Sequence, residues 1–86
     1  MRKDIEACSL QTSIRYGEAE APPVLVFLAQ SGEFELGLPG GARPRFSASS
    51  PADVHTLRAF LEALLGSSKD LRRATAFIDT HAQLSY

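Results

Sequence analysis

The sequence predicts an α+β domain in which an antiparallel sheet of three to four strands carries two C-terminal helices packed on one face. Residues 7–47 contain alternating or continuous apolar segments separated by turn residues, as strands do. Residues 50–82 instead repeat apolar side chains every three to four positions, as helices do. Because the strands come first and the helices follow, we expect two layers rather than an alternating α/β arrangement.

Size and composition predict one domain over residues 1–86, since domains of about 100 residues are common. The longest apolar run, 24–29, is far shorter than the roughly 20 residues that cross a bilayer. No export signal is visible near the N-terminus, and Cys8 is the sole cysteine. These features predict a soluble protein of the reducing cytoplasm with no membrane contact.

The first strand is expected over residues 7–16, where Cys8, Leu10 and Ile14 alternate with polar residues. Such alternation gives one apolar and one solvated face. The following segment, 17–23, ends in two prolines, which have no N–H to donate to a ladder. This segment is predicted to be a loop.

A hairpin is expected next. Residues 24–29 are continuously apolar and rich in strand formers, which predicts a central strand. A tight turn with Gly32 follows, and residues 33–38 alternate as a second strand. One layer of helices can cover only half of the side chains of 24–29, so the other half is expected to be hidden by loops, by self-association or by a partner.

The next segment, 37–45, contains three glycines and two prolines and is predicted to be a loop, with 45–47 as at most a short edge strand. Arg43 and Arg45 on this loop are candidates for docking to an acidic protein surface. Glu33 and Glu35 are expected on one strand face, as edge charges that discourage sheet stacking. These four residues are the candidate partner-binding residues.

Two Ser-x-x-Asp sequences, 50–53 and 67–70, each precede an apolar-periodic stretch and indicate helix starts. The first helix begins at Pro51 and ends at Gly66. Its predicted apolar stripe consists of Val54, Leu57, Phe60, Leu61, Leu64 and Leu65. The second helix is expected over 71–82, although its β-branched residues leave a strand over 75–79 as an alternative.

Charge argues for a protein partner rather than nucleic acid. Nine basic and ten acidic side chains give a net charge of −1, which provides no general affinity for phosphates. Six acids and three bases lie in residues 1–40, against four acids and six bases in residues 41–86. This uneven distribution predicts a charged protein partner.

No residue pattern predicts catalysis, a metal or a cofactor. Cys8 with His55 or His81 could form a nucleophile and base, but Cys8 is expected on an apolar strand face, where cysteine acts as a small hydrophobe. Metal sites need at least three ligands at short spacing, and none is present. The loop 37–45 lacks the lysine and hydroxyl that follow the glycines of a P-loop. We therefore expect a protein that is not an enzyme.

The order of elements resembles that of some small phage-encoded anti-CRISPR inhibitors. The resemblance extends over most of the chain and depends on Phe46, the capped helix start at Ser50, the break at Gly66-Ser67 and Leu71. It implies a stoichiometric inhibitor that binds one protein surface of a nucleoprotein complex. No functional residue is transferred by it.

Three functional hypotheses follow from the sequence. The first is a non-enzymatic protein-binding module, as a stoichiometric inhibitor or an immunity protein. The second is a structural homodimer component without a separate ligand, paired through the uncovered sheet face or the helices. The third is a small enzyme that uses Cys8 as its nucleophile.

Overall fold

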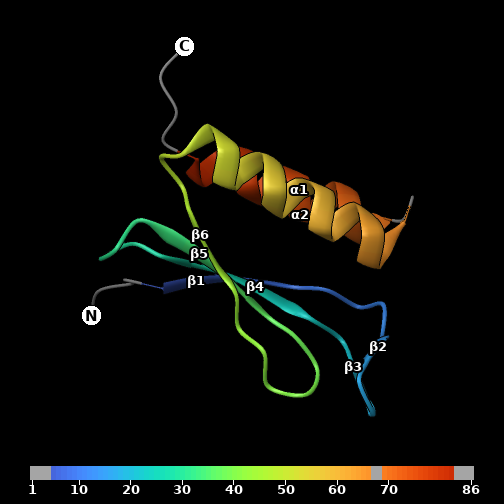
Figure 1. Ribbon diagram of the computed structural model, residues 1–86. Coiled ribbons are helices and arrows are strands. Elements are labelled where there is room, and N and C mark those ends of the chain that lie inside the picture. Colours follow the sequence, from blue (N-terminus) through green and yellow to red (C-terminus); the bar gives the residue numbers. More distant parts are fainter. Residues whose placement is uncertain (1–4, 67–68, 83–86) are drawn as a thin grey trace.

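The computed structural model describes residues 5–66 and 69–82 (Figure 1). It confirms the predicted α+β fold: both helices lie on one side of a four-stranded antiparallel sheet, and a separate two-stranded sheet extends from one end. The elements are β1 (Ile5–Ser9), β2 (Ile14–Tyr16), β3 (Ala19–Ala21), β4 (Val24–Leu28), β5 (Glu33–Gly37), β6 (Arg45–Ser47), α1 (Pro51–Leu65) and α2 (Lys69–His81).

The main sheet has the strand order β1-β4-β5-β6, and every neighbouring pair is antiparallel. The apolar segment predicted to be central is β4, which pairs on both sides. Gly32 forms the expected turn after it, with φ of 69° and its N–H 2.8 Å from the Leu28 carbonyl oxygen. The hairpin and the short edge strand β6 therefore form as predicted.

The predicted first strand, 7–16, is wrong in its extent. It divides into β1, which belongs to the main sheet, and β2, which pairs with β3 in the small sheet. The predicted loop 17–23 is also wrong in part, because it contains β3. Arg15 lies opposite Glu20 in that pair, where opposite charges favour cross-strand pairing. The two prolines follow β3 and separate it from β4.

The corner between β1 and β2 is fixed by a residue of α2. One carboxylate oxygen of Asp70 accepts a hydrogen bond from the Gln11 N–H at 3.2 Å, and the other accepts one from the Thr12 N–H at 2.7 Å. These two backbone donors are thus satisfied by a side chain and not by a strand ladder. The chain leaves the main sheet at this point.

Helix α1 has the predicted boundaries. The Ser50 hydroxyl accepts a hydrogen bond from the Asp53 N–H at 3.2 Å, and Gly66 ends the helix with φ of 64°. The Asp53 carboxylate in turn accepts a bond from the Ser47 N–H at 3.0 Å, which ties the helix start to β6. The predicted capping serine at position 67 lies outside the described residues.

Residues 69–81 form α2, so the alternative strand over 75–79 is wrong. The hydroxyl of Thr80 donates to the Ala76 carbonyl oxygen at 2.9 Å, a bond that accommodates threonine within a helix. An ion pair between Arg58 and Asp79 joins the two helices. The amphipathic period thus outweighs the β-branched residues.

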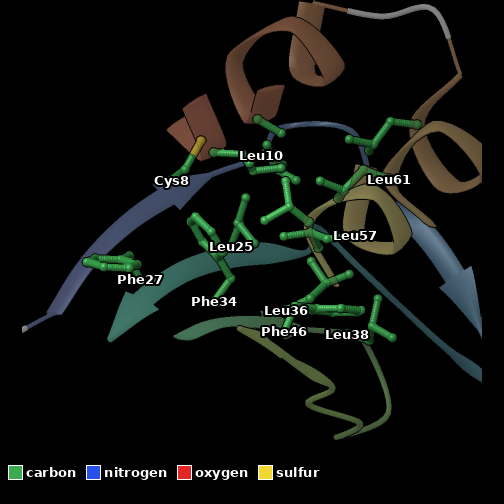
Figure 2. Close-up of a cluster of buried hydrophobic side chains, with 14 of the residues drawn as sticks. Cys8, Leu10, Leu25, Phe27, Phe34, Leu36, Leu38, Phe46, Leu57 and Leu61 are labelled. Carbon is green, nitrogen blue, oxygen red and sulfur yellow. The ribbon is translucent and has the colours of Figure 1, made fainter. Parts of the chain in front are cut away.

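The core lies between the sheet and the helices, as Figure 2 shows. Of the predicted α1 stripe, four residues are buried and two pack partly buried against the core. Leu25 and Leu36 from the sheet and Leu57 and Leu61 from α1 are completely inaccessible. Phe27 lies at one end of the core, where the His81 ring stacks on it with centroids 4.5 Å apart.

Candidate protein-binding face

The side of the main sheet that faces away from the helices is the candidate site. We call it the open face. No helix or strand of residues 5–66 and 69–82 lies over it (Figure 1). Strand register places neighbouring side chains on it in rows, such as Ala7, Val26, Glu35 and Arg45. Its members are Ala7, Ser9, Val24, Val26, Leu28, Glu33, Glu35, Gly37, Arg45 and Ser47.

The centre of the open face is aliphatic. The side chains of Val24, Val26 and Leu28 on β4 alternate with the buried Leu25 and Phe27, and they remain half-buried. This agrees with the expectation that one helical layer covers only one side of this strand. Apolar side chains grouped on a sheet face without helices are a common feature of interaction sites.

Beside the aliphatic centre lies a charged cluster. Arg45 places its Nε 3.1 Å from a Glu35 carboxylate oxygen and its Nη1 3.5 Å from one of Glu33. The structure thus brings together three of the four predicted partner-binding residues. Exposed ion pairs contribute about 0–1 kcal/mol, so this cluster shapes the surface more than it stabilises the fold.

Arg45 is the first residue of β6, the short edge strand predicted over 45–47. One detail of the partner-binding prediction is wrong. Glu33 and Glu35 lie on one strand face as predicted, but β5 is an interior strand between β4 and β6, so they are not edge charges. Alternate side chains of a strand point to the same sheet face, and on β5 the side chains of Glu33 and Glu35 point to the open face.

Arg43 lies on the rim of a hollow in the open face. The hollow has a volume of about 360 Å³ and is lined by Val24, Val26, Glu35, Gly37, Leu38, Gly41 and Arg43. The loop is held by bonds from the Leu38 N–H to the Ala42 carbonyl at 2.9 Å and from the Gly41 N–H to the Leu38 carbonyl at 3.1 Å. Arg43 is exposed and forms no ion pair within residues 5–66 and 69–82. Its guanidinium is therefore available to a carboxylate from outside the chain.

A second, shallower hollow of about 570 Å³ lies between β1 and α2. Its lining residues are Ala7, Cys8, Ser9, Arg73, Ala76, Phe77 and Thr80. Burial raises the pKa of the Cys8 thiol, an effect larger than the opposing influence of the Arg73 charge. Neither His55 nor His81 lines this hollow. Among the described residues, the thiol therefore has no histidine beside it in this hollow, and its pKa is raised, whereas a cysteine nucleophile uses an adjacent base or a lowered pKa.

Asp70 makes a tertiary contact, with Gln11 and Thr12, that its place in the Ser-x-x-Asp sequence 67–70 did not indicate. Its side chain is only 7% exposed, and Arg73 lies 3.6 Å away. Hydrogen bonds from the Thr12 hydroxyl and from the Gln11 and Thr12 N–H groups hold its pKa below the ordinary value, against the opposing effect of desolvation. An aspartate in a first helical turn is common, so its sequence position gave no signal of this tertiary contact.

Two classes of feature are missing from residues 5–66 and 69–82. Neither helix there has the length and apolar composition that a membrane crossing needs. The same residues hold no group of three or more His, Cys, Asp or Glu side chains placed to bind a metal ion.

Comparison with known proteins finds no relative. No protein-family model matches the chain, and neither a curated protein nor a solved structure is significantly similar to it. The resemblance in element order to anti-CRISPR inhibitors thus gains no further support.

Proposed function

We propose that this chain is a non-enzymatic protein-binding module and that its open face docks onto one protein partner. The observation that carries the proposal is the half-buried aliphatic row Val24, Val26 and Leu28, over which no described helix or strand lies and which the loop between β5 and β6 borders. Burial of apolar surface against a partner stabilises a complex by about 25 cal/mol per Å² of area removed from water. A partner of complementary shape is therefore expected to bind at this row.

The face also defines the chemistry of its partner. The hollow beside Arg43 has aliphatic walls from Val24, Val26 and Leu38, which suit one apolar side chain. Because Arg45 is already paired with two glutamates, Arg43 is the unpaired cation that the described residues around the hollow offer to a partner. We therefore expect a partner segment in which an apolar side chain lies next to a carboxylate.

A stoichiometric inhibitor, or an immunity protein, is the narrower form of this function. The resemblance in element order to phage anti-CRISPR proteins favours the inhibitor, with a protein surface of a nucleoprotein complex as the target. Occlusion of such a surface requires binding alone. It needs no nucleophile, metal or cofactor in the chain.

Site-specific photo-crosslinking in cells of the native host tests the proposal. A photoreactive amino acid replaces Val26 on the open face, and in a matched control it replaces Ala59, an exposed residue on α1. We expect the Val26 derivative to form one discrete heterologous adduct that the Ala59 derivative does not form. The adduct should decrease at least tenfold when Arg43→Glu is added, whereas Arg72→Glu on α2 should leave it unchanged.

The outcomes separate the functional hypotheses. Equal crosslinking from both positions, or adducts insensitive to Arg43→Glu, would contradict docking through the open face. Adducts of the Val26 derivative with a second copy alone would favour the structural homodimer that pairs through this face.

A further inference from the structure

The free edge of β1 offers a second interaction surface, formed by backbone groups. In an antiparallel pair, alternate residues direct both the N–H and the C=O toward the neighbouring strand. The bond from the Leu10 N–H to the Pro23 carbonyl oxygen shows that Leu10 points toward the β4 side. By alternation, the backbone groups of Cys8 also point toward β4, and those of Ala7 and Ser9 point outward.

This edge differs from the other edge of the sheet. Strand β6 is only three residues long and follows Pro44, and short strands and prolines are features that discourage further pairing. Strand β1 is five residues long, contains no proline or lysine, and has the small residues Ala7, Cys8 and Ser9 in its second half. The described backbone of β1 therefore contains no proline that would block ladder bonds with another strand.

Among the described residues, the two ends of the β1 edge carry side chains of opposite charge. At the Ser9 end, Arg73 of α2 lines the hollow and is 46% exposed, and it also lies 3.6 Å from the buried Asp70 carboxylate. At the opposite end, Glu6 is 55% exposed and lies 3.5 Å from the His81 ring nitrogen. An antiparallel neighbour with the same sequence brings its own Glu6 to the Arg73 end and its own Arg73 to the Glu6 end. The edge is therefore complementary to itself.

We propose that two copies of this chain pair through β1 in antiparallel orientation, with Ala7 opposite Ala7 across a two-fold axis. The outward groups of Ala7 and Ser9 then form ladder bonds, and a continuous sheet of eight strands results, four from each copy. The interface is separate from the aliphatic row of β4. This proposal is independent of the proposed function, because each copy keeps its open face.

The helices are compatible with this pairing. Helix α2 lies beside β1 on the side away from the open face, and its residues Ala76 and Thr80 are exposed and line the hollow. Strands pair at about 4.8 Å and helices pack at about 8–10 Å. In the dimer, the α2 helices of the two copies face each other. The small side chain of Ala76, near the middle of α2, leaves room for them to pack at about 8–10 Å.

Hydrogen exchange of the purified chain tests this register without any substitution. Sedimentation across a wide concentration range should show a monomer–dimer equilibrium. The amide protons of Ala7 and Ser9 should exchange at least tenfold more slowly when the dimer predominates, while the Cys8 amide stays protected in both states because it points toward β4. A monomer at all concentrations, or a dimer in which the Ala7 and Ser9 amides stay unprotected, overturns the proposal.

Substitutions give a second test. Ala7→Pro removes an outward N–H and no bond to β4, so it should abolish the dimer and leave the circular dichroism spectrum unchanged. Arg73→Glu should weaken dimerisation at least tenfold, and adding Glu6→Arg should restore it. Arg72→Glu, the matched control on α2, should have no effect. Failure of the paired substitution to restore the dimer contradicts the charge complementarity.

The two proposals fail separately. If the chain is a monomer at all concentrations but the Val26 derivative still forms its heterologous adduct, only the β1 dimer is overturned. A dimer with protected Ala7 and Ser9 amides, but without a heterologous adduct at Val26, would overturn only docking through the open face. An extended foreign peptide that protects these amides in a chain that stays monomeric would also overturn self-pairing.

Discussion

Asp70 shows how one side chain determines the local path of a distant segment. Its carboxylate binds two backbone donors that lie 59 and 58 residues earlier in the sequence. A carboxylate that accepts several hydrogen bonds favours its charged form, so the contact is also a pH-sensitive element of stability.

The first prediction concerns acid stability. Because the folded pKa of Asp70 is below its unfolded value, the contribution is complete above the unfolded pKa of about 4 and is lost as the pH falls through the folded pKa. Asp70→Asn should therefore lower the stability near neutral pH and flatten its decline in acid, as urea unfolding over a pH series measures. Glu62→Gln, at an exposed site on α1, is the control. Identical pH profiles for Asp70→Asn and the wild type would contradict this role.

The second prediction concerns Cys8. Burial raises its pKa from 9.0, so little thiolate exists at neutral pH and the folded protein should react slowly with a thiol reagent. Unfolding in urea should restore the rate of a free cysteine. Fast reaction of the folded chain at neutral pH would reopen the hypothesis of a cysteine enzyme.

At the scale of single elements, local sequence signals predict α1 and the β4–β5 hairpin well. The Ser50 cap, Pro51 and Gly66 mark the helix, and Gly32 marks the turn, because each acts within a few residues of its position. The division between β1 and β2 was not predictable in this way. Period-two alternation continues through residues 7–16, whereas the cause of the division lies in α2.

The third prediction tests the packing of α1. Leu61 has no exposed surface, so Leu61→Ala should lower the free energy of unfolding by about 2–5 kcal/mol through the cavity it leaves. The control is Glu62→Ala at the neighbouring exposed position, which should change the free energy of unfolding by less than about 0.5 kcal/mol. Denaturant unfolding measures both, and a harmless Leu61→Ala would mean that the stripe is not packed.

The fourth prediction tests the cap of α1. Ser50→Ala removes the acceptor of the Asp53 N–H and should cost about 1 kcal/mol. Ser50→Asp should retain most of the stability, because an aspartate can accept the same bond. Equal losses for the two variants in thermal unfolding would show that the cap contributes little.

At the scale of the whole molecule, composition predicted that one sheet face would carry apolar side chains, but it did not predict which side chains lie next to one another on that face. The continuously apolar β4 indicated that one helical layer would cover only one sheet face, and the structure shows a second face without helices. The pairing of Arg45 with Glu33 and Glu35 depends on which strands become neighbours, and the sequence alone does not fix that. The exposed backbone edge of β1 depends on strand order in the same way.

The contact between Asp70 and residues 11–12 also bears on synthesis. A ribosome releases β1 long before α2, and for that interval Gln11 and Thr12 do not have the Asp70 carboxylate to bind. We expect the nascent chain to acquire this corner only after Asp70 has left the ribosome. A polypeptide stalled before position 69 should therefore resist a protease less well around residues 10–13 than the released one.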